Sequence, residues 1–121
     1  MAEPVSNVRI VLTSAGSQQD ACRLARTLVE EHLAACATLI PTVQSVYRWK
    51  GNIESAQEAL LFIKTTAEQI AALEARLHQL HSYQTPEFLV LEVNAGSKRY
   101  LDWLLAACTL PDAAKSALVC D

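Results

Sequence analysis

The stretch "TVQSVYRWKGNIESAQEALLFIKT", residues 42–65, decides the fold of this 121-residue chain. Two runs of strand-forming residues meet at Lys50-Gly51-Asn52, where Gly and Asn supply the permissive backbone geometry of a tight turn. The preceding stretch "AACATLIP", residues 34–41, extends the first run. Together they predict one long antiparallel hairpin.

Patterns on both sides of the hairpin predict the other elements. They are a strand from residue 8 to about 15, a helix over 18–33 capped by Ser17, a helix over 67–80 opened by a capping box at residues 66–69, a strand over 87–93 opened by Pro86, and a short helix capped by Ser97. The order strand-helix-strand-strand-helix-strand predicts an α+β, ferredoxin-like split βαβ fold. We expect one domain over 1–121, with its core at about 8–107 and a C-terminal tail at 108–121.

Alternation along the strands predicts that both faces of the sheet are apolar. Right-handed crossovers place both helices on one face, which we assign to Leu61 and Ile63, and we assign Leu60 to the other face. A soluble monomer rarely leaves so large an apolar patch open, so we expect a homo-oligomer. The predicted interface residues are Tyr47, Trp49, Phe62, Phe88 and Val90, with Val11 on the same face. The alternative is that the hairpin folds back over its own sheet.

Composition excludes several classes of function. The net charge is −3 and no run of Lys or Arg forms a phosphate-binding stripe, which excludes nucleic acid as a partner. The apolar runs are shorter than the ~20 residues that a membrane helix needs. The first residues lack the pattern of a secretory signal, so we expect a cytoplasmic protein with reduced thiols at its cysteines. The cysteines are Cys22, Cys36, Cys108 and Cys120.

Five stretches occur in an order and spacing that resemble the CutA divalent-cation tolerance family. They are "LAACATLIP", "SVYRWKGNIE", "LLFIKTT", "HSYQTPEFLVLEV" and "YLDWL", and they cover about residues 8–107. The resemblance implies a homotrimer of ferredoxin-like subunits that acts in tolerance to copper and other divalent ions. Two departures are His81-Ser82-Tyr83 in place of His-Pro-Tyr, and Thr13 near the place where some members carry cysteine. Loss of that thiolate disfavours copper(I).

The matched motifs nominate two overlapping sets of site residues. The expected ligands for copper(II) or another divalent ion are His81, Cys36 and Glu87. The expected lining of a pocket between subunits is Trp49, Lys64, Tyr83 and Glu87. Lys64 and Glu87 are expected to face each other across this pocket, as an ion pair or as a clamp on a ligand.

Other interpretations of these residues stay open. His78 lies three residues before His81 and could join it and Glu74 as a metal ligand, but a histidine also suits a helix C-terminus. Cys36 suits core packing better than ligation, because small buried thiols are common in apolar strands. The sequence contains no nucleophile elbow and no phosphate-binding glycine loop, so we expect a binding protein and not an enzyme. The alternative function is a trimeric signalling or scaffold module that binds a small metabolite or a protein in its clefts.

Overall fold

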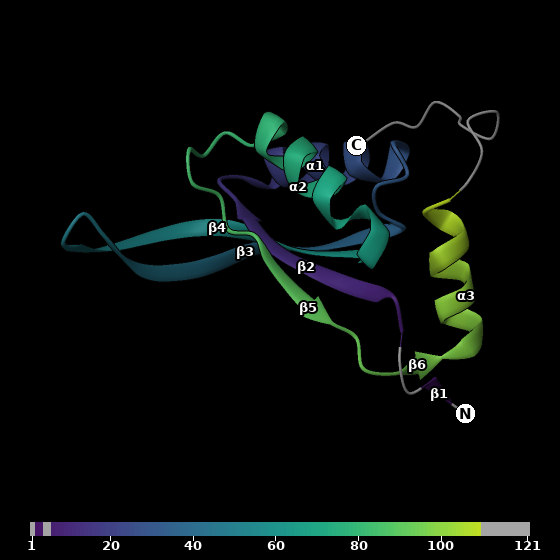
Figure 1. Ribbon diagram of the computed structural model, residues 1–121. Coiled ribbons are helices and arrows are strands. Elements are labelled where there is room, and N and C mark those ends of the chain that lie inside the picture. The colour runs from purple at the N-terminus through teal and green to yellow at the C-terminus, as the bar shows by residue number, and fades with distance from the viewer. Residues whose placement is uncertain (1, 4–5, 110–121) are drawn as a thin grey trace.

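The computed structural model describes residues 2–3 and 6–109. It consists of a twisted main sheet with helices packed against it and a small second sheet (Figure 1). The elements are β1 (Ala2–Glu3), β2 (Val8–Ala15), α1 (Gln18–Glu30), β3 (Cys36–Trp49), β4 (Asn52–Thr66), the 3₁₀ turn Ala67–Gln69, α2 (Ile70–Leu80), β5 (Leu89–Glu92), β6 (Gly96–Ser97) and α3 (Lys98–Ala107). The predicted α+β class is confirmed. The tail from residue 110 on, with Cys120, lies outside the described residues.

The main sheet has the strand order β3-β4-β2-β5, and all three pairings are antiparallel. β4 pairs with β2 only from Ala59 to Thr66, whereas its first half, residues 52–58, pairs with β3 alone. This outer part of the hairpin forms a two-stranded ribbon that extends beyond the helices (Figure 1). A register shift between Ile40 and Val43, at Pro41, separates the ribbon from the rest of β3, as expected for a proline within a strand.

The turn of the hairpin consists of two residues with positive φ, Lys50 (φ 50°) and Gly51 (φ 83°). Trp49 pairs with Asn52 on either side of them. The turn was predicted correctly, but Asn52 does not supply its unusual geometry, because it is the first residue of β4. Lys50 takes this conformation instead, as the first position of a two-residue turn with both φ values positive requires.

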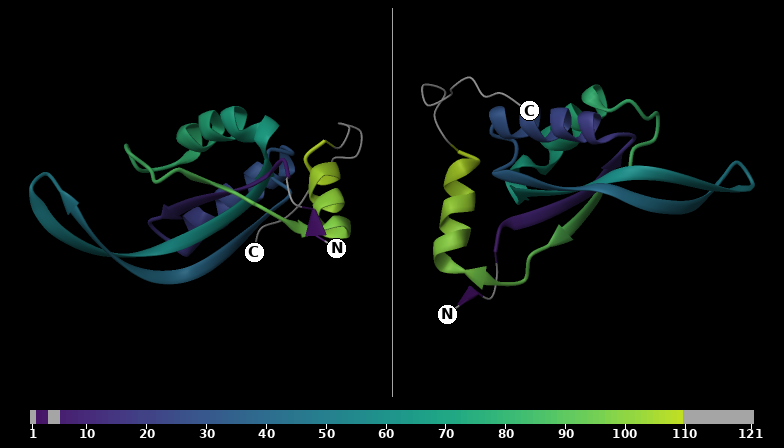
Figure 2. Two further views of the ribbon diagram at one scale, coloured as in Figure 1. Left: turned by 60° about the horizontal axis from the view of Figure 1, so that its bottom comes forward. Right: turned by 180° about the vertical axis from the view of Figure 1, so that it is seen from behind.

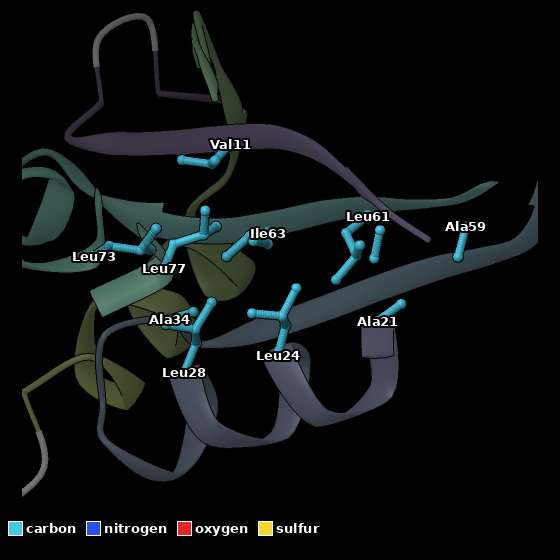
Figure 3. Packing of buried hydrophobic residues seen from close by; sticks show 11 residues of the cluster. Val11, Ala21, Leu24, Leu28, Ala34, Ala59, Leu61, Ile63, Leu73 and Leu77 are labelled. Carbon is cyan, nitrogen blue, oxygen red and sulfur yellow. The ribbon is translucent and has the colours of Figure 1, made fainter. Parts of the chain in front are cut away.

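The main core lies between the sheet and the helix pair α1 and α2, which cover the same face (Figure 2). Leu24 and Leu28 of α1 point towards Leu61 and Ile63 of β4 (Figure 3). Each of these four side chains is at most 4% exposed. Burial of such a side chain contributes ~1.5–3 kcal/mol, so this layer holds β4 in register beneath the helices.

The predicted helix caps are confirmed at two of three places. The Ser17 side chain accepts a hydrogen bond from the Asp20 backbone N–H, and Ser97 accepts one from the Tyr100 N–H. The capping box at residue 66 is wrong: Thr66 makes no side-chain cap hydrogen bond, and a 3₁₀ turn precedes α2. The last strand is also shorter than predicted, because it begins at Leu89, three residues after Pro86.

A second, smaller core lies beneath α3, at the end of the sheet opposite the ribbon (Figure 1). Leu101 and Leu104 pack there with Val8, Ala35 and the buried Cys108. The two-residue strands β1 and β6 pair next to α3 and were not predicted. Strands this short carry no detectable alternation in the sequence.

The face of the sheet away from α1 and α2 is apolar, and the helix pair leaves it uncovered in the part of the chain that the structure describes. The strand register places Leu60 and Phe62 on this face. Leu12 of β2 pairs with Phe62 on one side and with Leu89 of β5 on the other. Leu89 is 55% exposed and its neighbour Leu91 is 47% exposed. We call this surface the open face. Both apolar faces were predicted.

Three residues that were predicted on the open face lie on the helix side instead. Val90 pairs with Val11, which is fully buried in the main core, and Phe88 packs against that core. The sequence alternation separated Val11 and Val90 correctly from Leu89 and Leu91 but assigned the wrong side. Placement of Val11, Phe88 and Val90 on the open face is therefore wrong.

The cysteines differ from one another. Cys36 and Cys108 carry free thiols, as predicted, and burial raises the pKa of the Cys108 thiol. Cys22 is disulfide-bonded, so the prediction of a thiol is wrong there. No helix in residues 2–3 and 6–109 is long and apolar enough to cross a membrane.

Candidate functional site: an acidic, aromatic cleft beside the hairpin

The loop between α2 and β5 is held to the sheet by His81, which is 9% exposed. The Tyr83 backbone N–H donates to His81 Nδ1 over 3.1 Å, and His81 Nε2 lies 2.6 Å from the Ser14 carbonyl oxygen. A backbone N–H only donates and a carbonyl only accepts, so the ring is the neutral tautomer with its proton on Nε2. Both ring nitrogens are therefore occupied by backbone groups.

This arrangement gives His81 a structural role at the end of α2. A metal ligand needs an unprotonated ring nitrogen with a free lone pair, and here the lone pair of Nδ1 accepts the Tyr83 N–H. The prediction that His81 ligates a metal ion therefore does not fit its environment. Its effect on the site is indirect, because it fixes the position of the Tyr83 backbone.

Tyr83, thus positioned, reaches across to β4. Its hydroxyl donates to Glu58 Oε2 over 2.7 Å, and the Ser14 hydroxyl donates to the same oxygen over 3.3 Å. Burial and this hydrogen bond raise the pKa of Tyr83 to about 12. Because both neighbours donate to it, Glu58 is held in place as a carboxylate.

An open cleft of about 630 Å³ lies where the ribbon leaves the sheet, on the side of the open face. It is lined by Ser14, Ser45, Val46, Tyr47, Trp49, Glu58, Tyr83, Gln84, Thr85 and Glu87. The described residues that line it include two carboxylates and three aromatic side chains but no Lys, Arg or His. Its lining is therefore acidic and aromatic.

The Glu58 carboxylate affects the pKa of Glu87. Partial burial and the neighbouring Glu58 carboxylate raise the pKa of Glu87 above its ordinary value. Two like charges that disfavour each other's ionised form create a site where a cation relieves the repulsion. The cleft is therefore suited to positively charged ligands and unsuited to anions.

The structure brings together three of the four predicted pocket residues, Trp49, Tyr83 and Glu87. Lys64 is elsewhere: its Nζ donates to the Tyr100 hydroxyl of α3 over 3.3 Å and lies 5.6 Å from the ring centroid. This hydrogen bond is the main reason that the pKa of Lys64 is raised. Lys64 and Glu87 therefore do not meet within one chain, and their predicted pairing across a cleft between subunits stays a prediction.

Cys36 is also remote from the cleft. It pairs with Lys64 in the register of β3 and β4, six residues or ~20 Å along the strand from Glu58. Cys36, His81 and Glu87 thus do not meet within one chain. Among the described residues, no three His, Cys, Asp or Glu side chains are grouped as a metal site. His78 likewise remains at the helix end, with its Nδ1 2.9 Å from the Glu74 carbonyl oxygen.

Sequence reasoning missed Glu58, the residue around which the polar groups of the cleft are organised. A partial signal existed, because Glu58 and Glu54 are the two charged residues that precede Leu60 and Phe62 on the same face of the strand. Ser14 had no such signal, since its contribution depends on the antiparallel pairing of β2 with β4. Gln84 and Thr85 stood in a quoted motif but were not singled out.

Comparison with known proteins gives one consistent family. Residues 9–107 match the family described as CutA1 divalent ion tolerance protein. The divalent-cation tolerance protein CutA of Thermus thermophilus is 42% identical over 95 residues, which cover 78% of this chain and 92% of that protein. The structure of CutA from Synechococcus elongatus has a TM-score of 0.86 and 38% identity, covering 90% of this chain and 96% of that one.

A second structure from Synechococcus elongatus contains CutA complexed with a Bis-Tris molecule. It has a TM-score of 0.82 and 37% identity, and it covers 88% of this chain and 99% of that chain. The matches in sequence and in fold extend over nearly all the described residues. The chain therefore belongs to the CutA1 divalent ion tolerance protein family.

Proposed function

We propose that the chain is a ferredoxin-like subunit of a cytoplasmic homotrimer that acts in divalent-ion tolerance by binding a cation in its cleft, without catalysing a reaction. The observation that carries the proposal is the pair of carboxylates, Glu58 and Glu87, in a cleft with no basic lining residue among those described. Family membership supports the tolerance role.

The donor set of the cleft fits a divalent ion held by oxygen. Glu58 and Glu87 offer carboxylate oxygens, and Ser14 and Ser45 offer hydroxyls. Such ligands suit manganese, magnesium or calcium better than copper, which prefers nitrogen and sulfur. Only two of the ligands are charged, so binding is weak. Copper(II) remains within the proposal as an ion of lower preference.

Equilibrium dialysis tests this proposal. The wild type is dialysed against manganese(II) and copper(II) beside Glu87→Gln, which removes one charge from the cleft. Glu92→Gln is the matched control, because Glu92 is an exposed carboxylate on β5 outside the cleft. We expect weaker manganese binding by Glu87→Gln alone. Equal binding by all three proteins contradicts the cleft as the ion site.

Assembly into a homotrimer is supported by the open face. The helix pair α1 and α2 does not cover its apolar side chains on β2, β4 and β5 in the described part of the chain, and a lone two-stranded ribbon is marginal in water. Phe62 lies at the centre of this face, between Leu12 and Thr38. Sedimentation equilibrium of the wild type should give three times the chain mass, and Phe62→Asp should lower it. A monomeric wild type contradicts the trimer.

The proposed location is open to a direct test. A relative from Archaeoglobus fulgidus is described as periplasmic, whereas we expect this chain to remain in the cytoplasm. Fractionation of its own host, with immunodetection in the cytoplasmic and the exported fractions, separates the two locations. Recovery in the exported fraction contradicts our proposal.

A second candidate function is small-molecule sensing through the same cleft. The cleft volume of about 630 Å³ is far larger than one ion needs and lies in the range of ligand pockets. The Bis-Tris complex of the Synechococcus relative supports this alternative. A metabolite that binds only the folded protein raises its melting temperature, so a thermal-shift screen tests it.

A further inference from the structure

We propose that the cleft binds an organic ammonium ion, with Glu58 and Glu87 balancing its charge and Trp49 packing against its carbon substituents. This inference deepens the second candidate function, small-molecule binding, by naming the chemical class of the ligand. It does not depend on metal binding, because it requires the charge and the aromatic walls of the cleft and no resident ion.

Charge in the cleft selects cations. Glu58 accepts hydrogen bonds from Tyr83 and Ser14 through one oxygen, Oε2. Its other oxygen, Oε1, makes no hydrogen bond among the described residues, and Glu87 makes none and no ion pair there either. A carboxylate accepts up to about four hydrogen bonds. Two carboxylates with unused acceptor capacity and no basic neighbour in the lining form a site for a positive charge.

Aromatic side chains make the site suitable for an organic cation. Trp49 is 47% exposed and Tyr47 is 44% exposed, and both line the cleft from the ribbon, while Tyr83 lines it from the loop. The face of an indole or phenol ring attracts ammonium groups, and tryptophan does so best. Alkyl substituents on the nitrogen also bury apolar surface against these rings, which a hydrated metal ion cannot do.

The fixed position of Tyr83 indicates that part of the cleft is formed before a ligand binds. His81 holds the Tyr83 backbone, and Glu58 holds its hydroxyl. The His81 and Tyr83 rings also pack together, with centroids 4.8 Å apart. One aromatic wall and one carboxylate are therefore ordered relative to each other before any ligand arrives, and such preorganisation lowers the cost of binding.

The test uses choline chloride and its uncharged isostere 3,3-dimethylbutan-1-ol, which has the same branched shape with carbon in place of nitrogen. Binding of each to the full-length wild type is measured by isothermal titration calorimetry in EDTA, and quenching of tryptophan fluorescence gives a second readout. We expect choline to bind at least ~10-fold more tightly than the alcohol, as a desolvated cation–π contact and a nearby carboxylate together imply.

Two pairs of variants locate the binding. Glu87→Gln and Trp49→Leu should each weaken choline binding by ~3-fold or more. Their matched controls are Glu92→Gln on β5 and Trp103→Leu on α3, whose tryptophan is 48% exposed and lies outside the cleft. The controls should bind choline as the wild type does. The comparison of choline with the alcohol needs no variant, so it stands even if a variant misfolds.

Each result decides the proposal. Equal binding of choline and the alcohol would show an apolar pocket without charge selection, and absence of choline binding would show that another group, such as a second copy of the chain, fills the cleft. Either result overturns the proposal. The proposal is also overturned if the control variants lose as much choline affinity as the cleft variants do. Manganese binding without choline binding leaves ion binding intact and removes only this inference.

Discussion

Replacement of His81 by alanine should destabilise the protein far more than replacement of His78, although the two histidines are three residues apart on the same helix end. His81→Ala removes two hydrogen bonds, of 2.6 Å and 3.1 Å, and leaves the Ser14 carbonyl and the Tyr83 N–H without their partners. An unsatisfied buried group costs ~1–3 kcal/mol. Because water can reach the half-buried Tyr83, we expect a total loss of ~2–4 kcal/mol.

His78→Ala is the matched control. His78 is exposed, and its Nδ1 is near only the Glu74 carbonyl oxygen, so its replacement should change the free energy of unfolding by no more than ~0.5 kcal/mol. Urea unfolding at one fixed protein concentration measures both. With a slope of ~2 kcal/mol per molar urea, His81→Ala should lower the midpoint by ~1–2 M. Equal midpoints for the two variants would refute the structural role of His81.

Three further predictions concern the cleft and the hairpin turn. Tyr83→Phe should abolish the tyrosine ionisation near pH 12 that an ultraviolet titration of the wild type shows. The pKa of Tyr83 in the folded protein is raised above 10.0, so the stability that Tyr83 contributes is complete below pH 10 and is lost as pH rises through about 12. Glu58→Gln should lower the pKa of Glu87 towards its ordinary value, since it removes a neighbouring charge, and carboxyl NMR titration measures the change. In urea unfolding, Gly51→Ala should lower the free energy of unfolding by ~1 kcal/mol, because alanine tolerates positive φ less well than glycine. Lys50→Asn should raise it, because asparagine tolerates positive φ better than lysine. A change of the same sign in both variants would contradict the turn geometry.

The arrangement of elements could be predicted because local signals agreed with the long-range pairing. The turn at Gly51 and the caps at Ser17 and Ser97 are set by nearby residues, and the structure confirms them. The direction in which Val90 points could not be predicted in this way. Alternation fixes which residues share a face, but only the pairing of Val90 with Val11 shows which face the helices cover.

The site was predicted where its residues belong to the matched motifs, as Trp49 does in the ribbon. Tyr83 and Glu87 belong to the loop that the motif describes, and both line the cleft. His81 was assigned to metal because it stands in a matched motif, but its two backbone partners come from β2 and from the loop itself. For Glu58 the sequence contains only the alternation of its own strand, and its contact with Ser14 depends on the pairing of β4 with β2.

The ribbon at residues 43–58 has a consequence for how association can be observed. Those of its backbone amides that point inward bond to the opposite strand of the ribbon, and no third strand among residues 2–3 and 6–109 pairs with it. Their hydrogen exchange therefore reports whether another molecule covers the ribbon. If the ribbon is covered in an assembly, its amides at residues 43–58 should exchange slowly, and their exchange rates should rise when dilution separates the subunits. The amides of β2, which lies inside the sheet, would serve as an internal reference.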